Sequence, residues 1–301
     1  MPDETELVLL DGGLATELER RGHDLSDALW SARLLFDRPD EIVATHLSYF
    51  RAGAQVATTA SYQASFRGFA ARGVGRDDAA ALMRRSVELA REAAEVAEAD
   101  DGVRRYVAAS VGPYGAVLAD GSEYTGDYGV ADTALRDFHR ERTEVLATAG
   151  ADLLAMETVP SEQEAAVLLD VLDEMPEGTR GWLSLTCADG GTTRRGEDVD
   201  RVFALAQGHA RVVAVGVNCT APEHVEELVH RAVAASGKPA IAYPNSGESW
   251  DAAARAWGGD GAGVDGDAAQ RWVAAGARYV GGCCRVGASD IARLAGSLRP
   301  L

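Results

Sequence analysis

Eight short apolar runs, separated by longer charge-bearing stretches, place the strongest constraint on the fold of this chain. The runs are rich in Val, Leu and Ala, and they are continuous rather than alternating, as expected of strands buried on both faces. They span Val8–Gly13, Ala54–Ser61, Tyr106–Gly112, Asp152–Thr158, Gly181–Thr186, Val212–Cys219, Ala240–Ser246 and Arg278–Cys284. Eight β-α units in 301 residues predict a closed (β/α)8 TIM-type barrel rather than an open doubly wound sheet.

The stretches between the runs carry the start and stop signals of helices. Helices are predicted at Pro39–Arg51, Asp77–Ala99, Asp132–Ala149, Ser161–Asp173, Pro222–Ala235 and Ser289–Leu298. An Ala-Gly-Ala sequence precedes a strand at residues 52–54, 149–151 and 275–277, where glycine supplies a left-handed C-cap. No linker separates a second domain, so one domain is expected over residues 1–301. The glycine-rich stretch 258–263 follows no apolar strand and is expected to be a mobile loop.

The charge of the chain limits the classes of partner that it is expected to bind. It has 29 basic and 47 acidic residues, a formal net charge of −18, which disfavours nucleic acid and anionic membrane surfaces. The N-terminus is acidic and no apolar run has the length of a membrane span, so a cytoplasmic location is expected. Lys238 is the only lysine and precedes an apolar strand, which excludes Schiff-base, pyridoxal and P-loop chemistry. The expected substrate is a small molecule.

The carboxyl ends of the predicted strands are unusually polar, and in a β/α barrel these ends form the active site. Three of the four cysteines lie there, because Cys219 ends the sixth run and Cys283 and Cys284 end the eighth. Three sulfur ligands with an open fourth position are typical of catalytic zinc. Cysteine is also a common core residue, so spacing alone leaves both interpretations open, and Cys187 is expected to lie in the core.

Other side chains at these ends have two candidate roles each. Glu157 ends a buried run, where an unpaired charge is costly, and we favour a ligand ammonium over a structural salt bridge as its partner. Asp11 precedes two glycines and either binds a ligand or forms a turn. Tyr62, Tyr114 and Trp30 either wall a cationic group or pack in the core. The histidines are all expected on helix surfaces or in flanking loops, which disfavours a His-rich metal site; they are His23, His46, His139, His209, His224 and His230.

Seven motifs together resemble the zinc-dependent homocysteine S-methyltransferases. They are Asp11-Gly-Gly-Leu-Ala-Thr-Glu-Leu-Glu-Arg-Arg-Gly22, Thr59-Ala-Ser-Tyr-Gln63, Ser110-Val-Gly-Pro-Tyr-Gly115, Glu157-Thr158, Gly216-Val-Asn-Cys219, Tyr243-Pro-Asn-Ser-Gly-Glu248 and Gly281-Gly-Cys-Cys-Arg285. The resemblance runs from residue 8 to residue 296 and is closest to the single-domain members that use S-methylmethionine. It is more distant from betaine–homocysteine methyltransferase and from cobalamin-dependent methionine synthase. The Asn-Cys and Gly-Gly-Cys-Cys motifs are specific, whereas Asp-Gly-Gly alone is weak.

The resemblance implies a role for each matching residue. Cys219, Cys283 and Cys284 would bind Zn2+, and Glu157 would hold the ammonium of homocysteine. The residues expected to bind substrate are Asp11, Gly12, Gly13, Trp30, Thr59, Tyr62, Glu157, Asn218, Asn245, Ser246 and Gly247. The resemblance also leads us to expect a monomer or small homo-oligomer without folate, cobalamin or activation domains, and without the C-terminal dimerisation segment of the betaine enzymes.

The reaction implied by the resemblance moves a methyl group from a sulfonium donor to the thiolate of zinc-bound homocysteine, giving methionine. Coordination deprotonates the thiol without a general base. S-methylmethionine is the expected donor and S-adenosylmethionine a second one, with betaine as the alternative. Outside the family, the alternative is a noncatalytic thiolate barrel that binds zinc or senses redox state. A phosphate-binding isomerase is disfavoured, because Cys-Cys-Arg stands where a glycine-rich phosphate loop is expected.

Overall fold

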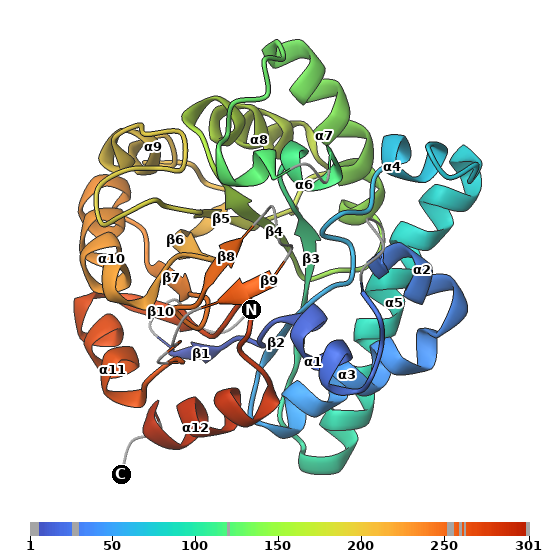
Figure 1. The fold of residues 1–301 in the computed structure, drawn as a ribbon, viewed down its shortest axis with the longest axis horizontal. Coiled ribbons are helices and arrows are strands. Elements are labelled where there is room, and N and C mark those ends of the chain that lie inside the picture. The colour runs from blue at the N-terminus through green and yellow to red at the C-terminus, as the bar shows by residue number, and fades with distance from the viewer. Residues whose placement is uncertain are drawn as a thin grey trace.

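The computed structural model describes residues 6–25, 30–118, 121–251, 256–258, 261 and 263–298. At its centre lies a sheet of eight parallel strands in the order β1-β10-β7-β6-β5-β4-β3-β2 (Figure 1). These strands are β1 (Val8–Leu9), β2 (Val56–Thr58), β3 (Tyr106–Val111), β4 (Leu153–Val159), β5 (Gly181–Leu185), β6 (Val212–Asn218), β7 (Ala240–Tyr243) and β10 (Ala277–Val280). A parallel bridge between Leu10 and Val56 joins the first and last strands of this order, so the sheet closes. The predicted (β/α)8 barrel is confirmed.

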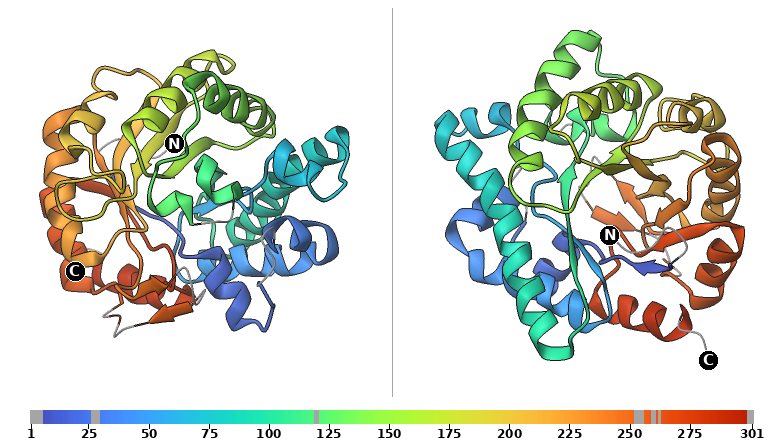
Figure 2. Two further views of the ribbon diagram at one scale, coloured as in Figure 1. Left: turned by 45° about the horizontal axis from the view of Figure 1, so that its top comes forward. Right: turned by 180° about the vertical axis from the view of Figure 1, so that it is seen from behind.

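Helices surround the strands on all sides (Figures 1 and 2). Each packs on the next around the ring, and the last packs on the first. In ring order they are α3 (Pro39–Arg51), α5 (Arg76–Asp101), α7 (Asp132–Ala147), α8 (Glu162–Glu174), α9 (Val199–Ala204), α10 (Pro222–Ser236), α11 (Gly266–Ala275) and α12 (Ala288–Leu298). The six predicted helices are therefore present, and their apolar faces cover the outer face of the barrel. None of the helices within the described residues is both long and apolar enough to cross a bilayer.

Smaller elements extend the loops at the carboxyl ends of the strands. They are α1 (Leu14–Arg20), α2 (Trp30–Asp37), α4 (Phe66–Ala70), α6 (Tyr114–Leu118), the 3-10 helix η1 (Ser122–Tyr124), β8 (Ser249–Asp251) and β9 (Ala256–Gly258). Strands β8 and β9 form an antiparallel hairpin between β7 and α11. No apolar run in the sequence predicts this hairpin. Most of the glycine-rich stretch that follows it, at residues 259–260 and 262, lies outside the described residues.

Side chains fill the interior of the barrel. Trp182, Tyr243 and Tyr279 are buried there against small side chains such as Ala108 and Ala155. Large residues on some strands thus face small residues on others, as in the packed layers of barrels of this type. Because the interior is filled, a ligand has access only to the ends of the strands.

Seven of the eight barrel strands end earlier than predicted, and the released residues form the mouth of the barrel. Strand β4 instead ends at Val159, one residue beyond its predicted end. Strand β7 ends at Tyr243 because Pro244 has no N–H group to donate to a neighbouring strand. Strand β6 ends at Asn218 because Cys219 has a φ of 48°, in the left-handed region. Many of the polar residues predicted at the strand ends therefore lie in loops that leave the sheet, whereas Glu157 and Thr158 lie within β4.

Candidate metal and substrate site

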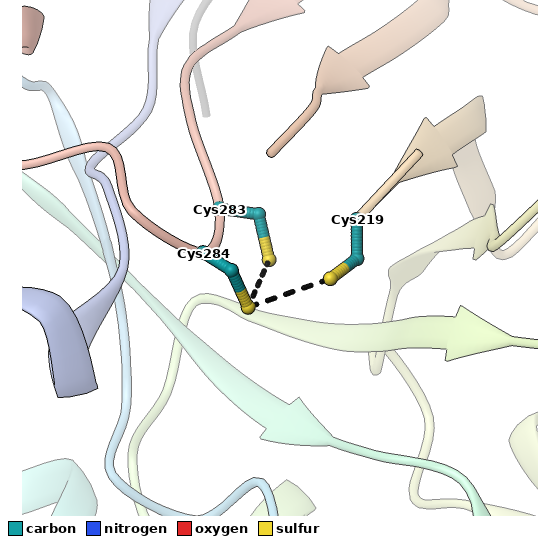
Figure 3. Close-up of side chains that lie close together, drawn as sticks. All are labelled: Cys219, Cys283 and Cys284. Carbon is teal, nitrogen blue, oxygen red and sulfur yellow. Dashed lines mark hydrogen bonds between the residues drawn. The ribbon is translucent and has the colours of Figure 1, made fainter. Parts of the chain in front are cut away.

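Cys219, Cys283 and Cys284 lie together at the carboxyl end of the barrel (Figure 3). Their Sγ atoms all lie within 4.8 Å of one another. The Sγ atom of Cys284 is 3.4 Å from that of Cys219 and 4.0 Å from that of Cys283. Cys219 follows β6 and the other two follow β10, and only β7 separates these strands in the sheet. The three thiols therefore converge, as the positions of their strands predict.

The sulfur atoms fit a tetrahedral soft metal. Zinc–thiolate bonds are about 2.3 Å long, so two sulfur ligands of a tetrahedral site lie about 3.8 Å apart. The separations of 3.4 and 4.0 Å lie on either side of that value. All three cysteines are free thiols. Hydrogen bonding from Cys283 and Cys284 lowers the pKa of Cys219 well below its ordinary value, and the same bonds to Cys219 raise the pKa of Cys283 and Cys284. One of the three sulfur atoms is therefore favoured as the thiolate that metals bind.

Glycines allow the Cys283–Cys284 turn to lie against the first strand. A Cβ atom at Gly281 would lie 2.6 Å from the Cβ of Leu10, and one at Gly13 would lie 2.6 Å from the carbonyl oxygen of Cys283. A side chain at either position would force the two loops apart. The glycines therefore fix the position of the cysteine pair.

Glu157 is a buried carboxyl group at this mouth, with 7% of its surface exposed. Ser110 donates a hydrogen bond to its Oε1, and Tyr243 donates to its Oε2 at 3.1 Å. The Tyr243 hydroxyl accepts a hydrogen bond from Trp182 Nε1 at 3.0 Å. Burial raises the pKa of Glu157 to about 7, the hydrogen bonds oppose this rise, and the charge of Cys283 adds to it. A buried carboxylate of this kind is suited to a ligand cation.

Asn218 fixes the backbone beside Glu157. Thr158 has a φ of 59°, which β-branched residues rarely adopt. Its amide donates to Asn218 Oδ1 at 2.7 Å, and Asn218 Nδ2 donates to Thr158 Oγ1 at 2.7 Å. The same Nδ2 lies 3.8 Å from Cys283 Sγ. One side chain therefore connects the strand of Glu157 to the thiol cluster.

Asp11 ties the first strand to the second. It is 3% exposed, and its carboxyl group accepts hydrogen bonds from the amide and the hydroxyl of Thr58, both at 2.7 Å. Burial raises the pKa of Asp11 to about 8. The hydrogen bonds from Thr58 oppose this rise, and the charge of the nearby Glu157 adds to it. The carboxyl group thus bonds across to β2. Gly12 and Gly13 follow it, and the Gly13 amide donates to the carbonyl of Val286 at 2.9 Å.

Thr59 and Tyr62 lie in the loop after β2. The Thr59 hydroxyl is 2.7 Å from that of Ser61 and accepts a hydrogen bond from the Ser110 amide at 3.0 Å. The ring of the half-buried Tyr62 packs on Gly112, where a Cβ atom would lie 2.6 Å from a ring carbon. Both residues therefore lie on the wall between β2 and β3.

Asn245, Ser246 and Gly247 form the turn after β7. The Gly247 amide donates to Asn245 Oδ1 at 2.9 Å, and the Ser246 amide donates to the carbonyl of Cys284 at 3.1 Å. This turn therefore holds the backbone of a metal-ligand candidate from the neighbouring loop.

Several site residues were not assigned by sequence reasoning. Ser110 and Tyr243 hold Glu157, and a polar residue inside an apolar strand was the signal that would have found Ser110. Glu248 accepts from Ser246 at 2.8 Å and from Arg285 Nε at 2.9 Å. Arg285 has a φ of 68°, which no sequence pattern indicates.

Other candidates lie apart from the cluster or outside the described residues. Cys187 is 1% exposed, burial raises its pKa to about 12, and its predicted place in the core is confirmed. Trp30 begins α2, but its side chain lies outside what the structure describes. Tyr114 packs edge-to-face on Phe138, with ring centroids 5.0 Å apart.

The prediction that the histidines lie on helix surfaces is wrong for His46 and His139. Both are fully buried, on the inner faces of α3 and α7. Burial lowers the pKa of His46 to about 4, which leaves a neutral imidazole. His139 Nε2 lies 2.7 Å from an oxygen of Glu164. A neutral ring can occupy an apolar helix face, so the residue type alone did not predict exposure.

Comparison with known proteins agrees with this geometry. The family described as homocysteine S-methyltransferase matches residues 8–298. A homocysteine S-methyltransferase of Escherichia coli (strain K12) is 47% identical over 296 residues, which cover 97% of this chain and 95% of that relative. A selenocysteine Se-methyltransferase of Brassica oleracea var. italica is 43% identical over 294 residues, covering 92% of this chain and 85% of that relative.

Among solved structures, the homocysteine methyltransferase MmuM from Escherichia coli in its metallated form matches with a TM-score of 0.88 and 45% identity. The match covers 97% of this chain and 96% of that one. The resemblance expected from the sequence motifs is confirmed over nearly the whole barrel. The chain belongs to the homocysteine S-methyltransferase family.

Proposed function

We propose that this chain transfers a methyl group from S-methylmethionine to the sulfur of homocysteine. Three thiols beside a buried carboxyl group, at one mouth of the barrel, carry this proposal. In the reaction a methyl–sulfur bond of the sulfonium breaks and a methyl–sulfur bond forms on homocysteine. The donor leaves as neutral methionine, the acceptor becomes methionine, and the thiol proton is released. S-adenosylmethionine is the proposed second donor.

We propose zinc as the ion held by Cys219, Cys283 and Cys284. The sulfur separations support a tetrahedral site, and the similar Escherichia coli enzyme is described in a metallated form. Zinc bound there would lower the pKa of the homocysteine thiol and so supply a nucleophile at neutral pH. No general base is then required of the protein.

Glu157 is the proposed partner of the homocysteine ammonium. Its carboxylate is oriented by Ser110 and Tyr243, which leaves the ammonium as the charge that would compensate it. The other residues proposed to line the acceptor and donor positions are Asp11, Gly12, Gly13, Trp30, Thr59, Tyr62, Asn218, Asn245, Ser246 and Gly247. Their location around the strand ends supports this assignment for those whose side chains are described.

The donor is proposed to bind on the side of Tyr62, where an aromatic face can attract a sulfonium cation. The formal net charge of −18 also favours a cationic donor over an anionic one. The sulfonium and thiolate charges are both lost on transfer, so a mouth that excludes water favours the reaction. Betaine also carries a cationic methyl donor group and remains the alternative within the family.

We further propose that the barrel acts as one domain over residues 1–301, as a monomer or small homo-oligomer. The proposed location is the cytoplasm, where reducing conditions would keep the three thiols free.

The donor is tested by supplying methyl-labelled S-methylmethionine, S-adenosylmethionine and betaine in parallel, with homocysteine, zinc and a reductant. We expect label in methionine fastest from S-methylmethionine, slower from S-adenosylmethionine, and not from betaine. Label from betaine alone would replace the donor assignment. Zinc binding without transfer from any donor would instead favour the noncatalytic thiolate barrel.

A further inference from the structure

Arg142, on α7, is a fully buried arginine outside the thiol site. Its Nη2 donates to the carbonyl oxygens of Tyr62 at 2.9 Å and Ser61 at 3.2 Å, and its Nη1 donates to the carbonyl of Gly112 at 3.2 Å. Ser61 and Tyr62 follow β2, and Gly112 follows β3. One guanidinium group therefore joins the two loops that leave these neighbouring strands.

A second buried group favours the charged form of Arg142 through its electric field, without a direct ion pair. Burial lowers the pKa of Arg142 to about 10, which leaves it protonated at neutral pH, and Glu164 attracts it electrostatically. Glu164 is also fully buried. Burying a charged side chain is costly, and apolar side chains of similar volume are often at least as stabilising. Arg142 is therefore better explained by the loop geometry that it imposes than by the stability that it adds.

Glu164 holds the start of the segment after β3. It is the third residue after the helix N-cap Ser161, a position from which glutamate commonly bonds back to the cap. Here its carboxylate accepts from the Tyr114 amide at 2.6 Å, and from the Tyr128 hydroxyl at 2.9 Å. His139 Nε2 lies 2.7 Å from the same carboxylate. Glu164 thus holds the backbone of Tyr114, just as Arg142 holds the backbone of Tyr62.

The two loops are also in tight contact with each other. A Cβ atom at Gly112 would lie 2.6 Å from both a ring carbon and the carbonyl oxygen of Tyr62. The guanidinium of Arg142 lies 5.4 Å from the centre of the Phe138 ring, and Phe138 packs on Tyr114. A shift of either loop would therefore move the Tyr62 ring.

We propose that Arg142 is a positioning residue for the methyl donor, acting through Tyr62 and the loops after β2 and β3, with Glu164 as its buried counter-charge. This inference deepens the proposed function, since it assigns the donor to the Tyr62 side of the mouth. It leaves the thiol cluster, which follows β6 and β10, independent of Arg142.

The structural part is tested by hydrogen exchange on the full-length, zinc-loaded protein. In Arg142→Met, amides within residues 59–66 and 110–118 should exchange about tenfold faster or more, because local opening of the two loops becomes easier. Amides within residues 212–219 and 277–284 should keep wild-type rates. Arg140→Met is the matched control, since Arg140 lies on the same helix but is 58% exposed and pairs with Glu174. Arg142→Lys, which retains the charge but not the planar fork, should give an intermediate effect and decides the matter if Arg142→Met does not fold.

The functional part is tested by steady-state kinetics on the same variants. We expect the KM of the sulfonium donor to rise about tenfold or more, because misplacing a positioning wall by about 1 Å costs on the order of 100-fold. The zinc content should stay at its wild-type value, and the homocysteine KM should rise less than the donor KM, because Ser110 links the loops to Glu157 by one hydrogen bond only. Unchanged exchange in the two loops, a uniform rise across the whole protein, or an unchanged donor KM would each overturn the inference. A wild-type protein without methyl transfer would refute the proposed function, and the exchange pattern would then decide alone whether Arg142 holds the loops.

Discussion

Replacing Glu157 with glutamine should stabilise the protein at neutral and higher pH. The carboxyl group lies in a buried site that raises its pKa from 4.5 to about 7. One pH unit corresponds to about 1.4 kcal/mol, so ionising this group in the folded protein costs about 3 kcal/mol relative to the unfolded chain. Glutamine has the shape of the protonated acid and carries no charge. The variant should therefore gain up to about 3 kcal/mol in free energy of unfolding.

The gain should depend on pH in a defined direction. Between pH 4.5 and about 7 the folded protein keeps the Glu157 proton that the unfolded chain has lost, so stability of the wild type falls as pH rises. Below 4.5 both states are protonated and the two proteins should have similar stability. Above about 7 the difference should reach its full value and stay constant.

The assay is urea unfolding of both zinc-loaded proteins at several pH values from 4.5 to 8.5. Comparing the two proteins removes the pH dependence of zinc binding, which both share. A variant that is less stable than the wild type at pH 8, or a difference that does not change with pH, would refute the argument that burial strains this carboxylate.

The same variant should bind homocysteine poorly. Removing one partner of a buried ion pair costs about 3 kcal/mol or more, which is on the order of 100-fold in affinity. Calorimetric titration of the zinc-loaded variant with homocysteine measures this loss, and zinc content should remain complete. Wild-type affinity in the variant would exclude Glu157 as the ammonium partner.

Further predictions test the metal ligands, the Glu157 carboxylate that is proposed to bind homocysteine, and the packing of the barrel. Cys283→Ser should lose zinc and turnover together, whereas Cys187→Ala should keep both; metal analysis showing full zinc in the first variant would remove Cys283 from the ligand set. The kcat/KM for homocysteine should rise with pH up to about 7, because Glu157 ionises over this range. The pH–rate profile of Glu157→Gln should lack this rise. Gly216→Ala should cost about 3 kcal/mol or more in urea unfolding, because its Cβ would lie 1.9 Å from a carbonyl oxygen of β7. Gly296 lies on the exposed side of α12, with open space around it among the described residues, so Gly296→Ala should instead stabilise the protein by about 1 kcal/mol. The packing argument would be contradicted if both glycine substitutions changed the free energy of unfolding in the same direction.

The barrel could be predicted because its strands leave a strong pattern. Continuous apolar runs such as 152–158 separate cleanly from amphipathic helices such as 161–173, and the structure has β4 and α8 at these places. The β8–β9 hairpin left no such signal, since its strands have only three residues each. His46 and His139 were misplaced because a neutral imidazole can satisfy the apolar face of a helix.

The site was predicted where the topology determines it. Cys219, Cys283 and Cys284 follow strands that are nearly adjacent in any barrel of this order, so their convergence follows from the sequence. The residues that hydrogen-bond to Glu157 come from other strands, as Tyr243 does, so their contact depends on side-chain geometry. The spacing of residues along the sequence does not reveal such contacts. Arg142 was missed for the same reason, because its three acceptors are backbone carbonyls of distant loops.

The central claim is that the three cysteines hold a metal required for methyl transfer to homocysteine. The most direct test follows label from methyl-labelled S-methylmethionine into methionine, using protein freed of metal by a chelator and the same protein after zinc is restored. The account predicts no labelled methionine without zinc and full activity after zinc is returned, with zinc bound at one ion per chain. Equal transfer by the metal-free protein would contradict it.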